Sequence, residues 1–137
     1  MKKIFAITVI AFILNFIWEI SQAFLYAPHY VGIGGLVRVH LQASLGDVLL
    51  FLVILMLDAL VFGRDYVQKI DSKRLTMMMS IGFALAVAVE KYALFSGRWV
   101  YNFLMPIIPG LNVGLVPVLQ MMLIPVCVFF IFKRLKI

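Results

Sequence analysis

The stretch Ala43–Phe62, ASLGDVLLFLVILMLDALVF, decides the fold. A helix of about 20 residues rises about 30 Å, which is the thickness of the hydrocarbon core of a bilayer. Three further runs have a similar length and are as apolar: Ile4–Tyr26, Leu75–Phe95 and Val113–Phe132. The sequence therefore predicts four transmembrane helices in one domain that covers residues 1–137.

The composition of the whole chain supports the same class. The 137 residues are 65% hydrophobic and only 13% charged, which is more apolar surface than a soluble domain of this size could bury. The one plainly hydrophilic stretch is Gly63–Arg74. We expect an all-α protein, an integral membrane four-helix bundle with two structured loops on the side away from the cytoplasm.

The first run could be read as a signal peptide, because Lys2 and Lys3 precede it. Its apolar stretch continues beyond the usual length of a signal core, and no clear cleavage site follows. Its second half also carries Asn15, Glu19 and Gln22, which a disposable segment does not need. We therefore predict a retained helix.

The basic residues predict the orientation. Nine of the 12 Lys and Arg residues lie at the chain ends or in the middle loop: Lys2, Lys3, Arg64, Lys69, Lys73, Arg74, Lys133, Arg134 and Lys136. The opposite side holds Arg38, Lys91 and Arg98. The positive-inside rule then places both termini in the cytoplasm, as in a multi-pass protein of the cytoplasmic (inner) membrane. This rule and anionic lipid account for the net charge of +6, so a nucleic-acid partner is not expected.

Carboxylates inside the spans are the informative polar residues, because an ionisable group in hydrocarbon costs about 2.5–3.5 kcal/mol on insertion scales. Glu19, Asp47 and Glu90 lie on three runs at a similar depth, in the outer half. Arg98 lies in a loop near the same level. Three carboxylates at one depth exceed what packing requires, so we interpret them as catalytic candidates. Arg98 would orient a carboxylate or bind an anionic headgroup.

Helical spacing adds neutral polar residues to this cluster. Asn15, Glu19 and Gln22 are separated by four and three residues and share a helix face, as do Ser44 and Asp47. Gln120, in the fourth run, could close a ring around them, so Asn15, Gln22 and Gln120 are substrate-binding candidates. The alternative is that Asn15, Gln22, Ser44 and Gln120 are hydrogen-bonding residues that only hold the helices together.

His40 joins the face of Ser44 only if the second helix begins before Ala43. The alternation of apolar and polar residues over Val37–Gln42 favours an extended segment instead. A Ser44–His40–Asp47 triad is not favoured, since sequence neighbours rarely form one. We keep His40 and Ser44 as substrate-binding candidates.

The outer loops, Pro28–Gln42 and Ser96–Asn112, are too apolar for simple solvated connections. They predict a cavity that opens to the outer leaflet, with Glu19, Asp47, Glu90 and Arg98 at its floor. Trp99 and Tyr101 are further substrate-binding candidates, and the walls would be made by residues such as Trp18, Phe51 or Tyr101. For most of the aromatic residues here, an interfacial belt is the simpler explanation.

Several residues are interpreted as structural. Pro117 and Pro125 should interrupt the hydrogen bonds of the fourth helix. Gly82 and Ala86 form a pair of small residues for close helix packing, within the bundle or in a homodimer. Asp58 should be structural, with Arg64 close by, and Cys127 should be a buried apolar residue.

No motif for a cofactor is present, since the chain lacks a phosphate-binding glycine loop, a zinc motif and a nucleophile elbow. We therefore expect no cofactor. A metal between the carboxylates is a lesser alternative, because His29 and His40 are the only histidines.

The segments Asn15-Phe16-Ile17-Trp18-Glu19 and Leu25-Tyr26-Ala27-Pro28 resemble the N-x-x-W-E helix of integral-membrane terpene cyclases from meroterpenoid pathways. Intramembrane acids are thought to protonate an isoprenoid in those enzymes, which have seven spans, so the resemblance implies an acid role for Glu19. It covers about 14 residues.

The wider pattern resembles a group of small bacterial four-span membrane proteins and implies no particular activity. Its marks here are Trp18-Glu19, His40-x-x-x-Ser44-x-x-Asp47, Gly97-Arg98-Trp99-x-Tyr101 and Met105-Pro106.

These features favour an enzyme that uses carboxylic acid–base chemistry on a lipid or isoprenoid-like molecule in the outer half of the membrane. One carboxyl would stay protonated while another stays ionised, with Glu19 as the acid and Asp47 or Glu90 as its counterpart. A small proton-coupled transporter is the main alternative. An accessory membrane subunit that binds a partner is the third.

Overall fold

The computed structural model describes residues 2–65 and 70–135. Lys69 and Lys136, two of the basic residues that predict the orientation, lie outside the described residues. The elements in chain order are α1 (Lys2–Gln22), a 3-10 turn η1 (Ala23–Leu25), α2 (Gly32–Phe62), α3 (Ser72–Phe95), β1 (Ile107–Ile108), β2 (Val113–Gly114) and α4 (Leu115–Leu135).

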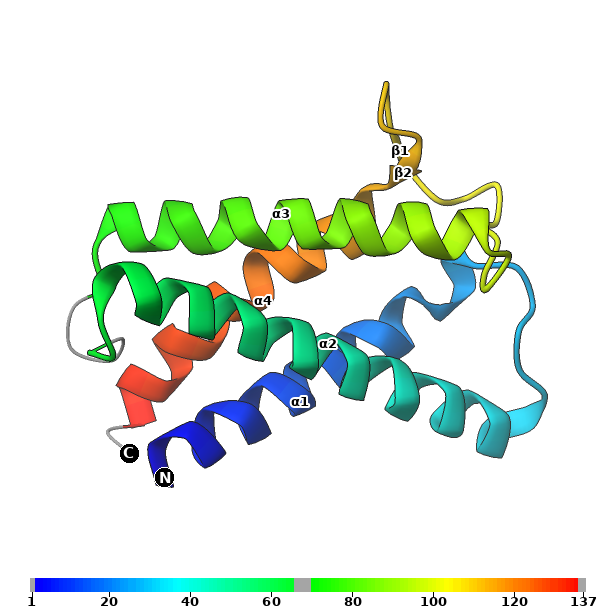
Figure 1. Cartoon of the computed structure of the whole chain (residues 1–137). Helices are drawn as coiled ribbons and strands as arrows, with labels where there is room; N and C mark the ends of the chain where they lie inside the picture. The colour runs from blue at the N-terminus through cyan, green and yellow to red at the C-terminus, as the bar shows by residue number, and fades with distance from the viewer. Residues whose placement is uncertain (1, 66–69, 136–137) are drawn as a thin grey trace.

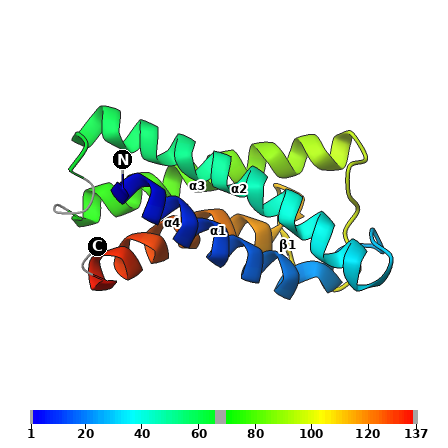
Figure 2. The ribbon, with the colours of Figure 1, turned by 90° about the horizontal axis from the view of Figure 1, so that it is seen from below.

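The four α-helices form a ring of antiparallel neighbours. Helix α1 packs mainly against α2 and α4, and α3 packs mainly against the same two helices. Both chain termini lie at one end of the bundle, which we call the terminal end (Figures 1 and 2). The opposite end carries the segments 26–31 and 96–114, and we call it the loop end. The all-α class is confirmed within the described residues.

The helices carry their apolar side chains on both the inside and the outside. A core of buried residues such as Phe51, Ile54, Phe129 and Phe132 fills the bundle. Large apolar side chains are also exposed along every helix, including Ile17 at 61%, Leu60 at 75% and Phe130 at 55%. All four α-helices are long and apolar enough to cross a membrane, so the chain has the features of a multi-pass membrane protein.

Helix α2 begins at Gly32, well before the predicted start at Ala43. The prediction of an extended segment at Val37–Gln42 is therefore wrong. The alternation misled because the outer face of this helix is itself apolar, so that exposed Val37 and Leu41 mimic the buried positions of a strand. The early start places His40 one turn before Ser44, and the Ser44 hydroxyl donates to the His40 carbonyl at 2.7 Å.

The two prolines of α4 differ in effect. Pro117 lies in the first turn, where no hydrogen bond of the helix is lost, so the predicted interruption there is wrong. Pro125 lies inside the helix. It leaves the Met121 carbonyl without its usual donor, and this carbonyl faces Gly82 of α3. A Cβ atom at Gly82 would lie 2.3 Å from the Met121 oxygen, so glycine is what allows α3 and α4 to approach here.

An ion pair closes the terminal end. The Arg74 Nε donates to Asp58 Oδ2 at 2.7 Å, and both side chains are buried. A second guanidinium nitrogen donates to the Gly63 carbonyl at 2.6 Å. The structural role of Asp58 follows from this contact, but its ionic partner is Arg74 rather than the predicted Arg64. Cys127, predicted to be buried, is exposed on the side of the bundle.

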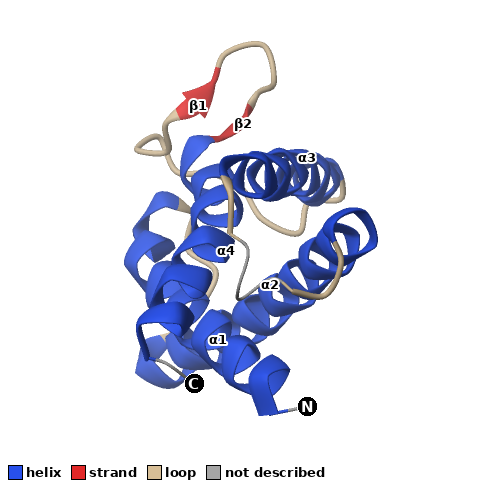
Figure 3. Cartoon of the chain, turned by 90° about the vertical axis from the view of Figure 1, so that its left-hand side faces the viewer, coloured by secondary structure: helices blue, strands red, loops and turns tan. Residues whose placement is uncertain are grey.

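The two segments of the loop end hold each other through the backbone. The Ala27 N–H donates to Val100 O at 2.8 Å, and the Asn102 N–H donates to Leu25 O at 2.8 Å. Beyond them, β1 and β2 form a short antiparallel hairpin that leaves the bundle beside α3 and α4 (Figure 3). The sequence predicted structured loops but not this hairpin.

Candidate functional site

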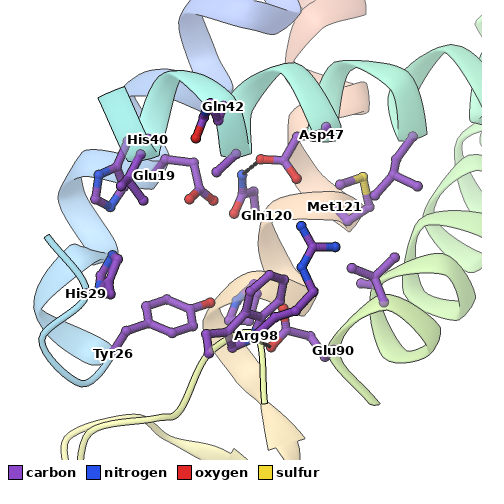
Figure 4. A pocket seen from close by; sticks show the side chains of 18 residues that line it. Glu19, Tyr26, His29, His40, Gln42, Asp47, Glu90, Arg98, Gln120 and Met121 are labelled. Atoms are coloured by element: carbon purple, nitrogen blue, oxygen red, sulfur yellow. Dashed lines mark hydrogen bonds between the residues drawn. The ribbon is translucent and has the colours of Figure 1, made fainter. Parts of the chain in front are cut away.

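A cavity of about 510 Å³ lies in the half of the bundle nearer the loop end. All four helices contribute to its lining, together with the loop that follows α3 (Figure 4). Its polar lining residues are Glu19, Tyr26, His29, His40, Gln42, Asp47, Glu90, Arg98, Trp99 and Gln120. The four charged residues that the sequence placed at a shared floor therefore meet at one cavity.

The α1 residues of the site follow the predicted helical face. Asn15 and Gln22 are buried behind the cavity, whereas Glu19 lines it. The Gln22 Nε2 donates to Glu19 Oε1 at 2.7 Å and to Gln120 Oε1 at 2.9 Å. These bonds fix the position of the Glu19 carboxyl.

Gln120 of α4 connects three helices. Its Nε2 donates to Asn15 Oδ1 at 3.0 Å and to Asp47 Oδ2 at 2.9 Å. The predicted ring of polar residues is thus present between α1, α2 and α4. Because one amide of α4 bonds to groups on two other helices, it suits a site that must keep two carboxyls in a defined position.

Glu19 of α1 and Asp47 of α2 both line the cavity, and the bonded amides of Gln22 and Gln120 join the two carboxyls. Two carboxylates in such a place cannot both stay charged without a large repulsion, whereas one shared proton turns the repulsion into a hydrogen bond. A carboxyl pair of this kind can give up or accept one proton.

Glu90 of α3 is held differently. The Tyr101 hydroxyl donates to Glu90 Oε2, and the Trp99 indole N–H donates to the same oxygen at 3.3 Å. Tyr101 in turn accepts from the Gly114 N–H at 2.8 Å. Burial first, and the Glu90 contact second, raise the pKa of Tyr101 above its ordinary value, so this hydroxyl keeps its proton as a donor. Glu90 thus connects α3 to the loop end.

Replacing Tyr101 by phenylalanine tests this connection. Tyr101→Phe should lower the stability of the purified protein by about 1–3 kcal/mol, because a buried carboxylate loses a donor. Exchange of the Gly114 amide hydrogen should become faster, since this N–H loses its acceptor. The matched control is Tyr92→Phe, whose ring is 63% exposed. Unchanged exchange at Gly114 would contradict the proposed coupling between Glu90 and the hairpin.

Arg98 brings the cation of the site. Its guanidinium points into the cavity from the loop that follows α3 (Figure 4). The guanidinium carbon lies 5.8 Å from the centre of the Trp99 ring, a cation–π distance. Among residues 2–65 and 70–135, the structure shows no carboxylate within 4.0 Å of Arg98.

Two histidines face each other at the cavity. The His40 Nδ1 lies 2.7 Å from Leu36 O, the His29 Nδ1 lies 2.8 Å from Ala27 O, and the ring centres are 5.4 Å apart. His29, Tyr26 and Gln42 were not predicted as lining residues. The close approach of His29 and His40 depends on the early start of α2, so no spacing rule in the sequence could reveal it.

Some predicted residues do not reach the cavity. Ser44 bonds to its own helix, Gln22 bonds to the Glu19 carboxyl, and Asn15 bonds to the Gln120 amide. Trp18 and Phe51, predicted as walls, lie elsewhere, and Tyr101 supports Glu90 from behind. The walls are instead Tyr26, Trp99, Leu50 and Met121. In the described part of the chain, no three His, Cys, Asp or Glu side chains are grouped so that they could hold a metal ion.

Comparisons with known protein families, curated proteins and solved structures find no match to this chain. The resemblance of the first helix to membrane terpene cyclases is therefore neither supported nor contradicted by them.

Proposed function

We propose that the protein is an intramembrane enzyme that uses carboxylic acid–base chemistry on a lipid or isoprenoid-like substrate. The observation that carries the proposal is the placement of Glu19 and Asp47 at one cavity of about 510 Å³, where the bonded amides of Gln22 and Gln120 join the two carboxyls. The apolar outer surface of the helices supports a location inside a bilayer. We further propose that the terminal end faces the cytoplasm, as the basic residues predict, so that the cavity lies in the outer half of the cytoplasmic membrane.

The chemistry that suits the site is a proton transfer to and from carbon. Glu19 would give its proton to a double bond of the substrate, and a carbocation would form next to the new C–H bond. Asp47 would then take a proton from a neighbouring carbon, which restores a double bond. One proton enters and one leaves, so the reaction is an isomerisation or a cyclisation and needs no other reactant.

The remaining lining residues have parts to play in this proposal. The ring faces of Tyr26 and Trp99 can stabilise positive charge on the substrate. Asp47 is preferred to Glu90 as the counterpart of Glu19, because two donors already hold Glu90. The acid role of Glu19 agrees with what the N-x-x-W-E resemblance implies. Within that motif Asn15 contributes through Gln120 rather than by touching a substrate.

The arrangement supports an enzyme over a transporter. A transport path needs polar or hydrated steps through the whole bundle. Between the cavity and the terminal end lie Phe51, Ile54, Phe129 and other fully buried apolar side chains. Beyond them Asp58 is already paired with Arg74. Proton-driven uptake by reconstituted vesicles would reverse this preference, and a stoichiometric partner that co-purifies would favour an accessory subunit.

Deuterium exchange tests the proposal for any substrate of this class. The purified protein, in nanodiscs that contain a bacterial lipid and isoprenoid extract, is incubated in deuterated water. An enzyme of this kind should place carbon-bound deuterium in one class of lipid, which mass spectrometry detects after back-exchange of the labile positions. Boiled protein and empty nanodiscs are the controls. Absence of protein-dependent deuterium in every lipid class would contradict the proposal.

A further inference from the structure

We infer that the substrate is an amphiphile with an anionic headgroup, which Arg98 binds while the apolar chain enters between α2 and α3. That this ligand is a substrate rests on the proposed function. The binding itself can be measured with no reaction taking place.

Among the charged groups that line the cavity, Arg98 is the one to which the described residues supply no hydrogen-bonding partner. Glu90 accepts from Tyr101 and Trp99, Asp47 accepts from Gln120, and Glu19 accepts from Gln22. The Arg98 guanidinium contacts the Trp99 ring face, and its N–H groups have no acceptor among the described residues. A guanidinium inside a cavity presents a fixed fork of donors, which fits the oxygens of a carboxylate or a phosphate.

The walls on the α2 and α3 sides are small and apolar. Ala43, Gly46 and Leu50 of α2 and Ala86 and Val89 of α3 line the cavity. A Cβ atom at Gly46 would meet nothing within 4 Å, so there is open space beside it. The two helices are close at the terminal end and diverge toward the loop end (Figure 1). A hydrocarbon chain that enters on this side would run along the small apolar wall beside Gly46.

Charge and shape together specify the ligand. The headgroup would lie at Arg98 near the loop end, and the chain would run along the apolar wall toward the bilayer centre. A volume of about 510 Å³ holds a headgroup and the first part of a chain, not a whole diacyl lipid. The double bond that receives the proton from Glu19 would thus be close to the headgroup.

Quenching of Trp99 fluorescence by brominated lipids can measure this binding. The chain has two tryptophans, so Trp18→Phe leaves Trp99 as the only reporter. The probes are dibromostearate, dibromostearyl phosphate and dibromostearyl alcohol in a non-ionic detergent. We expect one or both anionic probes to bind at least about tenfold more tightly than the alcohol, as for a charged hydrogen bond. The stronger of the two anions identifies a fatty acid or a phosphorylated lipid as the source.

Charge variants assign the preference to Arg98. Arg98→Gln should reduce the preference for anions to less than about twofold, and Arg98→Lys should keep part of it because the charge remains. Arg38→Gln is the matched control, since Arg38 is an exposed cation at the same end that does not line the cavity. Equal binding of the three probes to the parent protein would overturn the inference. So would an equal loss in the Arg38 variant, because surface charge would then be the cause.

A bulky residue at Gly46 tests the path between α2 and α3. Gly46→Phe should weaken quenching by all three probes at least about fivefold, whereas Gly34→Phe should not, although neither site is crowded. Full quenching in the Gly46 variant would overturn the proposed path. Tight anion binding without any deuterium exchange would contradict the proposed enzyme function but support the proposed binding site. Deuterium exchange without a preference for anionic probes would support the enzyme function but contradict the anion-binding site.

Discussion

Glu19→Gln and Asp47→Asn are each expected to lower protein-dependent deuterium incorporation by at least about 100-fold, the usual contribution of general acid–base catalysis. Each change keeps the size and the hydrogen-bonding capacity of the side chain but removes the group that exchanges a proton. Because the two carboxyls act as one pair, the double variant should be little worse than either single one. Mass spectrometry of the extracted lipid gives the rates.

The controls separate catalysis from structure. Asp65→Asn should keep the full rate, because Asp65 is exposed and does not line the cavity. Glu90→Gln should retain more activity than the Glu19 and Asp47 variants, because two donors from the loop end already occupy Glu90. If both amide variants of the pair retained the rate of the parent protein, the assignment would be wrong. If Glu90→Gln were the most damaged, Glu90 would be the counterpart of Glu19.

The sequence was sufficient for the helices because each span is a continuous apolar run whose length has to match a bilayer. It was also sufficient for the polar ring, since a period of 3.6 residues places Asn15, Glu19 and Gln22 on one face. It failed at the start of α2. In a soluble protein polar residues mark the outer face, but here exposed Val37 and Leu41 are as apolar as the core, so hydrophobicity does not separate inside from outside.

The position of each carboxyl residue along its helix could be predicted from the sequence, but the direction in which its side chain points could not. Glu19, Asp47 and Glu90 all line the cavity, yet their partners differ. The amides of Gln22 and Gln120 join the first two, whereas Trp99 and Tyr101 hold Glu90, because the rotation of each helix about its axis is determined by its neighbours. Likewise Asp58 pairs with Arg74 on α3 rather than with Arg64, which follows α2 directly. Contacts between distant segments depend on how the helices pack, and a single amino-acid sequence contains no local pattern that predicts them.

The Asp58–Arg74 pair should have the largest effect on stability of any contact in the bundle. Arg74→Ala is expected to lower the free energy of unfolding by about 3–5 kcal/mol, because it leaves a buried carboxylate without its cation. Asp58→Ala removes the carboxylate that pairs with the buried Arg74 guanidinium and should cost a similar amount. Reversible unfolding in mixed micelles of dodecyl sulfate and maltoside measures the change. Lys73→Ala, an exposed basic residue beside Arg74, should lie within about 0.5 kcal/mol of the parent.

A double replacement shows whether the ion pair itself stabilises the bundle, or whether the single variants lose stability only because one buried charge is left without its partner. Asp58→Leu with Arg74→Met removes both charges and keeps similar volume, so much of the lost stability should return. The Arg74 bond to the Gly63 carbonyl is lost in the double variant, which should leave a deficit of about 1–2 kcal/mol. Additive losses in the two single variants would instead show that the groups act independently. The ion pair would then not be what closes the terminal end.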